Sequence, residues 1–158
     1  MKKVCFYFHS MVIHNMILYN MIMAGLHLKI VTPEKLIFDE EVSQVNVSTE
    51  DGILGILPHH TNLMAKLKPG ELVVKRNGKA ETMAIGDGFL QMADNTLSIM
   101  TDLAVSEAAI DEKAVEEAKK RAEQALEQKL SDEEYAETLA ILEKSLAQLK
   151  IKRRHRVR

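Results

Sequence analysis

The adjacent pair His59 and His60 is the feature of this sequence that most readily suggests chemistry. Imidazole nitrogens bind metal ions and exchange protons near neutral pH. Successive side chains of an extended segment point to opposite faces, however, so two neighbouring histidines rarely close on one ion. A small metal-dependent jelly-roll enzyme using this pair is therefore the least favoured of three hypotheses. We expect the two histidines to be polar groups of a loop.

Other catalytic patterns are missing from the sequence. It has no His-x-x-x-His, no pair of cysteines, no Gly-x-Ser-x-Gly and no Walker-type phosphate loop. Turn chemistry explains Asp87, Asp94 and Asp102 better than acid–base catalysis does. We predict a protein that is not an enzyme by itself, with no catalytic residue and no bound metal.

Composition narrows the class of partner. The chain has 158 residues, 46% of them hydrophobic, which suffices for one or two small domains with a packed core. Its net charge of -2 argues against nucleic acid, and the absence of tryptophan argues against base stacking. Cys5 is the only cysteine, which excludes an intrachain disulfide and favours a reducing compartment.

Residues 1–24 form an apolar, methionine-rich segment behind Lys2 and Lys3. Polar residues such as His9 and Asn15 interrupt it, and a membrane span needs about 20 mainly apolar residues. We expect an N-terminal extension without function, with translation starting at Met21 or Met23; a cleaved or membrane-associating leader is the alternative.

Residues 25–107 have the pattern of an all-β domain. Leu26, Leu28 and Ile30 alternate with polar residues, as in a half-buried strand. Asn77-Gly78 and Asp94-Asn95 each separate two apolar runs, which predicts two hairpins. Short strands divided by turn residues at this spacing are typical of a β-sandwich, or flattened barrel.

The stretch from Glu50 to Leu72 holds three glycines and two prolines among aliphatic residues. Glycine permits unusual backbone angles, and proline fixes φ and removes a donor. We expect a shaped, exposed loop, and rigidly held loops often carry recognition.

Residues 108–158 change to helix formers, with no glycine or proline after Ile110. Asp111 is the expected N-cap of a first helix, and Ser131-x-x-Glu134 has the form of a capping box that opens a second. The second helix carries a heptad seam (Tyr135, Leu139, Leu142, Leu146, Leu149) that is expected to pack on small residues of the first. The sequence thus predicts a β-sandwich followed by a C-terminal antiparallel αα-hairpin.

The hairpin is thin, so its attachment to the sandwich is expected to be weak. Helices of about 20 residues are only modestly past the length at which isolated helices are marginal. Static packing and detachment toward a partner both remain open. The end of the second helix is basic, with Lys144, Lys150, Lys152, Arg153 and Arg154 in a hairpin that is otherwise rich in acidic residues. A solvated helix end or docking to an acidic protein surface would explain these cations, and we favour the protein surface.

Several motifs, in order, resemble one known family. Residues 26–38, LHLKIVTPEKLIF, are similar to its first two strands, and residues 52–60, GILGILPHH, to its G-x-x-G-x-x-P-G-H signature. Residues 67–70, LKPG, are similar to the motif that follows, and 88–91 and 95–99 to a later hairpin. From Leu26 to about Ile151 the chain resembles the epsilon subunit of F-type ATP synthase.

The resemblance implies a rotor part with several partners. The family's subunit lies beside gamma at the foot of the central stalk, rests on the ring of c subunits, and regulates ATP hydrolysis through helices that reach the alpha-beta head. It implies contact with gamma and the c ring through Ile53, Leu57, Pro58, His59 and His60. The basic residues named above are then expected to face the head. The expected location is the cytoplasmic side of the cell (inner) membrane, peripheral and held through the complex. A non-catalytic sandwich adaptor of another assembly is the alternative.

Two departures from the family pattern matter. His59 stands where the family usually has glycine, and Thr61-Asn62 replaces its Ala-Pro. Some bacterial members bind ATP through Ile/Leu-Asp-x-x-Arg-Ala at the start of the first helix. Here Ile110 and Asp111 match, but Ala114 and Val115 replace Arg-Ala. A guanidinium that pairs with phosphate is missing, so we expect weak or absent ATP binding and no cofactor.

Overall fold

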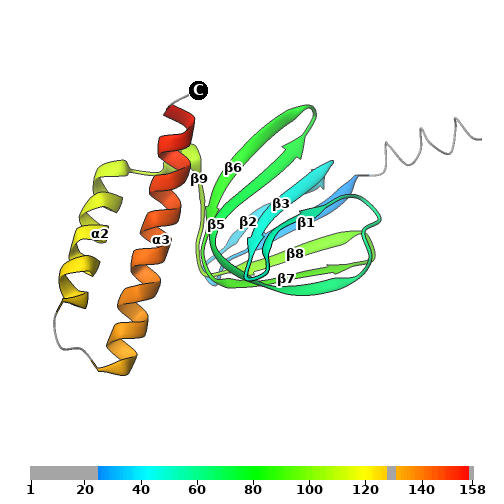
Figure 1. Ribbon diagram of the computed structural model, residues 1–158. Helices are drawn as coiled ribbons and strands as arrows, with labels where there is room; N and C mark the ends of the chain where they lie inside the picture. The colour runs from blue at the N-terminus through cyan, green and yellow to red at the C-terminus, as the bar shows by residue number, and fades with distance from the viewer. Residues whose placement is uncertain (1–24, 128–130, 157–158) are drawn as a thin grey trace, which may run out of the picture.

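The computed structural model describes residues 25–127 and 131–156. The expectations for residues 1–24 therefore lie outside the described part of the chain. Nine strands precede a short 3-10 turn and two helices (Figure 1). Their bounds are β1 Leu26–Val31, β2 Leu36–Val42, β3 Gln44–Thr49, β4 Gly52–Ile56, β5 Leu63–Arg76, β6 Lys79–Ile85, β7 Gly88–Ala93, β8 Thr96–Thr101, β9 Ala104–Ser106, η1 Glu107–Ala109, α2 Glu112–Leu126 and α3 Asp132–Arg156.

The strands form one sheet that folds over into a sandwich. Its order is β2-β1-β8-β7-β5-β3-β4, with β6 pairing both β5 and β9. Strands β1 and β8 run parallel, and the other pairs are antiparallel. Alternate residues of each strand fill the interior, for example Leu28, Leu90 and Ile99, all fully buried. The predicted fold class, a β-sandwich followed by an αα-hairpin, is confirmed.

The stretch from Glu50 to Leu72 is mostly strand, so the expectation of one long loop was wrong. Only Glu50 and Asp51, which turn from β3 to β4, and the residues between Ile56 and Leu63 leave the sheet. Strand β5 continues through Pro69 and Gly70, pairing with β7 before this point and with β6 after it. Bending one long strand lets it serve both layers of the sandwich, as a bulge does. The prolines and glycines of this stretch therefore shape a bend as well as a loop.

Both predicted hairpin turns are present. Asn77 and Gly78 join β5 to β6 with φ of 50° and 75°. Asp94 and Asn95 join β7 to β8 with φ of 49° and 58°. Two consecutive positive φ values are typical of the tight turns that match the twist of paired strands. Asparagine and aspartate tolerate this region better than other residues with a side chain, which explains their presence here.

The helices begin as expected. Asp111 accepts hydrogen bonds from the backbone nitrogens of Lys113 (3.0 Å) and Ala114 (3.4 Å) at the start of α2. The capping box of α3 is also formed. Ser131 N donates to Glu134 Oε2 at 3.0 Å, and Glu134 N donates to Ser131 Oγ at 3.3 Å. No helix in the described residues is long and apolar enough to cross a membrane.

In Figure 1, α3 lies between α2 and the sandwich. The expected leucine seam is only partly correct, because Tyr135, Leu139 and Leu146 are exposed. The buried residues of α3 lie toward its C-terminal end, where the helix touches both α2 and the sheet: Ser145, Ala147, Leu149 and Ile151. Tyr135 and Leu139 lie in the first half of α3, away from this buried end, whereas Leu146 is exposed within the second half.

Candidate interaction sites

The loop from Leu57 to Asn62 lies at the end of the sandwich away from the helices. It begins with a tight turn in which His60 N donates to Leu57 O at 3.1 Å. His59 has φ 61°, a left-handed conformation that favours glycine. Its backbone N–H donates to Asn95 Oδ1 at 2.8 Å. The loop is thus fastened to the neighbouring β7–β8 turn, and the His59 side chain is exposed.

Asn95 joins this loop to the start of the described chain. Its side-chain nitrogen donates to Gly25 O at 2.7 Å, and its backbone oxygen accepts from His27 N at 3.1 Å. One residue therefore holds three segments in a fixed arrangement. Within 25–127 and 131–156 no group of histidine, cysteine or acidic side chains is placed to hold a metal ion.

A row of apolar side chains crosses the outer face of β2, β1, β8 and β7. The sheet register places Leu36 beside Val31, Val31 beside Met100, and Met100 beside Phe89. We call these four residues the apolar row; they are exposed by 55%, 38%, 45% and 53% in the order Leu36, Val31, Met100, Phe89. A continuous exposed apolar row is typical of a surface that another protein covers.

Charged groups border the apolar row. Lys66 pairs with Phe89 in the register, and its ammonium lies 2.6 Å from Glu50 Oε1. The hydrogen bond and charge of Glu50 raise the pKa of Lys66, so its ammonium stays protonated within this ion pair. A shallow depression of about 510 Å³ adjoins the row and reaches Asp87 and Asp102. This surface was not among the predicted sites, although its signal in the sequence is an apolar residue at an outward position of each of four strands.

The basic end of α3 binds the sandwich. Lys144 pairs with Asp102, and Arg154 lies 2.8 Å from Glu71. Lys152 Nζ donates to Glu107 O at 3.2 Å. These contacts surround a small apolar cluster in which Ile151, Ile110 and Ala84 are buried: Ile151 comes from α3, Ile110 precedes α2, and Ala84 comes from β6. The hairpin is thus attached through a small apolar cluster and several partly exposed polar contacts.

The predicted site residues fall into separate places. The loop from Leu57 to Asn62, which we call the far loop, contains four of them: Leu57, Pro58, His59 and His60. Ile53 instead projects from β4, on the outer face that also contacts α3, and its side chain is 82% exposed. Among the five cations of α3, Lys144, Lys152 and Arg154 contact the sandwich region. Arg153 reaches Glu116 of α2 at 3.0 Å, and Lys150 is exposed. All five cations thus lie on one helix, but they contact different parts of the protein.

Ile110 and Asp111 both have structural roles, so neither side chain is available to bind a nucleotide. The carboxylate of Asp111 caps α2, and Ile110 is buried beneath α3. Ala114 and Val115 stand on the first turn of α2, where a phosphate-binding arginine would be needed. These residues do not fit an ATP site of the kind that the motif forms.

Comparison with known proteins decides the family. The model of the ATP synthase delta/epsilon chain β-sandwich domain matches residues 25–107, and that of the delta/epsilon long α-helix domain matches residues 109–153. The ATP synthase epsilon chain of Herpetosiphon aurantiacus is 35% identical over 133 residues, 84% of this chain and 98% of that relative. The chain belongs to the ATP synthase delta/epsilon family. As an epsilon chain it is a non-catalytic subunit of the rotary ATP synthase, as predicted.

A second relative and two solved structures are also similar to this chain. The epsilon chain of Nitratidesulfovibrio vulgaris is 35% identical over 128 residues, 81% of this chain and 96% of the relative. A chain in the Euglena gracilis mitochondrial ATP synthase (OSCP/F1/c-ring) has a TM-score of 0.69 at 24% identity, covering 87% of this chain and 84% of its own. A Tetrahymena thermophila central stalk/c-ring chain has a TM-score of 0.55 at 19% identity, covering 80% and 95%. These two similarities show that the fold is shared.

Proposed function

We propose that this epsilon chain is a rotor component of the central stalk that couples the c ring to the catalytic head and inhibits ATP hydrolysis through its hairpin. It acts at the cytoplasmic side of the cell membrane, peripherally, through the complex. The solved relatives come from assemblies that contain F1 and the c ring, or the central stalk and the c ring, which supports these partners. The apolar row and the far loop give the sandwich two surfaces for them.

Assignment of the surfaces follows their chemistry. The apolar row is a continuous surface across four strands, suited to a large permanent contact, and we assign it to gamma. The loop carrying Leu57, Pro58, His59 and His60 lies at one end of the sandwich, and we assign it to the c ring. The resemblance also implied that Ile53 contacts these partners. Because Ile53 lies on β4 and not in the loop, it is the least supported of the five predicted contact residues.

The weak attachment of the hairpin to the sandwich is the observation that supports the proposed inhibition of ATP hydrolysis. The contacts of α3 with the sandwich region include two ion pairs, one hydrogen bond and an apolar cluster of three buried residues with Val105 and Val115 packed against it. Partly exposed ion pairs contribute about 0.2–1 kcal/mol each. Burying one isoleucine adds about 1.5–3 kcal/mol. A hairpin held this loosely exchanges between packed and released forms, and release exposes Lys144, Lys152 and Arg154 to an acidic surface of the head.

The test is a truncation after Ser106, which removes the hairpin and leaves the strands complete. ATP hydrolysis by membranes that carry the assembled complex is expected to rise. Asp102→Asn with Glu71→Gln breaks the two ion pairs from the sandwich side and leaves the cations of α3 intact. This variant is expected to lower hydrolysis, because the hairpin is released more often.

Glu40→Gln is the matched control, since Glu40 pairs with Arg76 and not with the hairpin. It is expected to leave hydrolysis unchanged. An unchanged rate after truncation, with the complex still assembled, would show that the hairpin does not inhibit this enzyme.

A further inference from the structure

A groove runs between α3 and the outer face of the sheet. Its volume is about 940 Å³. One wall is α3, with Leu146, Lys150 and Arg154 at intervals of four residues. The floor comes from β3, β5 and β6, and Ile53 of β4 stands at the opposite side. Because both domains contribute, the complete groove exists only while the hairpin is packed.

Small side chains form part of the sheet side of the groove, beside larger ones such as Asn46 and Val73. Ser48, Gly52, Gly70, Ala80 and Thr82 line it. Small residues at a surface let another backbone approach closely. Leu146 and Ile53 remain exposed on its two sides although both are large and apolar. The groove therefore has room for a secondary-structure element, which would contact Leu146 on one side and Ile53 on the other.

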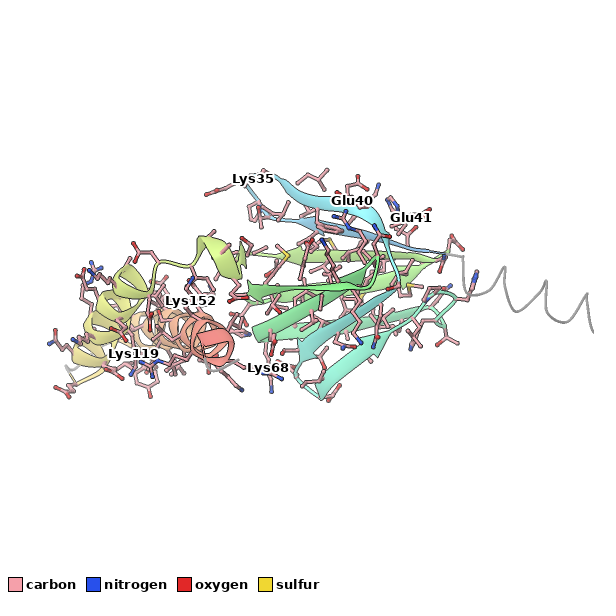
Figure 2. The ribbon with its side chains drawn as sticks, turned by 90° about the horizontal axis from the view of Figure 1, so that it is seen from above. Lys35, Glu40, Glu41, Lys68, Lys119 and Lys152 are labelled. Carbon is pink, nitrogen blue, oxygen red and sulfur yellow. The ribbon has the colours of Figure 1, made fainter. Side chains whose placement is uncertain are left out.

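The charged residues of the groove are mainly basic. The lining includes four cations, Lys68, Lys75, Lys150 and Arg154, against two carboxylates, Glu71 and Glu143. Arg154 and Glu71 pair with each other, and Lys75 donates to the neutral Gln44 at 3.0 Å. Lys68, Lys75 and Lys150 thus face a single remaining carboxylate. Figure 2 shows Lys68 on the part of the sandwich near the helices.

We propose that this groove is the docking site for an acidic amphipathic helix of a partner polypeptide. A helix lying beside α3 meets cations at the four-residue interval at which its own side chains repeat. Its apolar face would fill the space between Leu146 and Ile53, and its carboxylates would meet Lys68 and Lys150. Residues 1–24 are a poor occupant, because that segment has two lysines and no acidic residue.

Binding in this groove has a regulatory consequence, which rests on the proposed function. A ligand that contacts α3 and the sandwich together binds the packed hairpin and not the released one. It therefore shifts the population toward the packed form, by as much as its affinity for the two forms differs. The occupant would hold the hairpin away from the catalytic head.

The test uses the complete, purified ATP synthase with a photoreactive amino acid in place of Leu146. Irradiation is expected to give an adduct whose mapped peptide has acidic and apolar residues at helical spacing. Ile141 is the matched control, since it is an exposed aliphatic residue of the same helix outside the groove. The same probe there is expected to give no such adduct.

A second set of variants tests the charge argument. Lys68→Glu with Lys150→Glu is expected to lower the adduct yield about tenfold, because like charges then meet. Lys35→Glu, a change of the same kind on the far side of the sandwich in Figure 2, is expected to have no effect. No adduct from position 146, equal adducts from both positions, an adduct with a second copy of this chain, or a peptide without acidic residues would each overturn the proposal. The readout is the adduct and not ATP hydrolysis, so failure here is distinguishable from failure of the inhibitory role.

Discussion

The backbone N–H of His59 donates a 2.8 Å hydrogen bond to Oδ1 of Asn95, across 36 positions of sequence. His59 is in the left-handed region, with φ 61°, at the position where the family usually has glycine. The hydrogen bond offsets part of the cost of this conformation, which is about 1–2 kcal/mol for a residue with a side chain. The far loop therefore keeps a glycine-like shape while presenting an imidazole.

Replacing His59 by glycine is expected to stabilise the sandwich. Glycine adopts the positive φ without steric cost, and its larger entropy loss on folding offsets only part of the gain. We expect the free energy of unfolding to rise by about 0.5–1 kcal/mol, measured by urea denaturation of the full chain. Asp94→Gly is the matched control: its φ is 49° and aspartate tolerates that region, so a smaller gain is expected. A loss of stability for His59→Gly would contradict this account.

A side chain at position 70 is expected to disturb the bend of β5. A Cβ on Gly70 would lie 2.5 Å from Ser48 Oγ and 2.6 Å from Ser48 Cβ. Gly70→Ala should therefore lower the free energy of unfolding by about 1–3 kcal/mol, measured by thermal and chemical denaturation.

Two further variants isolate this contact. The penalty of Gly70→Ala should shrink in a Ser48→Gly background, because the atoms that clash are then gone. Gly55→Ala is a control in the neighbouring strand, where the nearest atom to a new Cβ is Asn46 Oδ1 at 3.2 Å. An equal penalty with and without Ser48 would place the strain elsewhere.

The start of α3 is expected to depend on pH through Glu134. Hydrogen bonds from the backbone and hydroxyl of Ser131 hold the pKa of Glu134 below its ordinary value. The folded form thus favours the carboxylate. The stabilising contribution of Glu134 is complete above the pKa that this residue has in the unfolded chain. It is lost as pH falls through the lower pKa that Glu134 has in the folded chain.

Comparison with Glu134→Gln separates this effect from other acidic groups. Thermal unfolding followed by the helical circular dichroism signal should show the native chain more stable than the variant near pH 7. The difference should disappear in acid, once Glu134 is protonated. A difference that is constant from pH 7 to acid would show that the carboxylate charge is not what caps the helix.

Binding of ATP by the isolated chain is expected to be weak or absent. Asp111 caps α2 and Ile110 is buried, while Ala114 and Val115 supply no cation for phosphate. Calorimetric titration should therefore detect no micromolar binding. Ala114→Arg with Val115→Ala installs the motif and should raise the affinity about tenfold or more if the rest of the site is present. Micromolar binding by the native chain would refute the prediction.

Much of this fold could be predicted from short-range patterns. Alternation in Leu26, Leu28 and Ile30 identified β1, and Asn77-Gly78 and Asp94-Asn95 identified two turns, because strand period and positive φ are local properties. Asp111 and the Ser131–Glu134 box identified both helix starts for the same reason. The same signals failed at Pro69 and Gly70. These residues suggest a loop locally, and only the pairing of β5 with both β6 and β7 makes them a bend.

The family, the succession of strands and helices, and the residues that cap the helices all follow from local sequence patterns. The interaction surfaces depend instead on how distant segments pair and pack. Val31, Met100 and Phe89 become one row through the register of three strands, and Asp102 meets Lys144 across 42 positions of sequence. Ile53 was predicted to lie with the loop residues, but in the structure it lines the groove together with Lys150 and Arg154. The physical reason is that pairing and packing between distant segments depend on the whole chain, whereas strand period, turns and caps depend on a few neighbours.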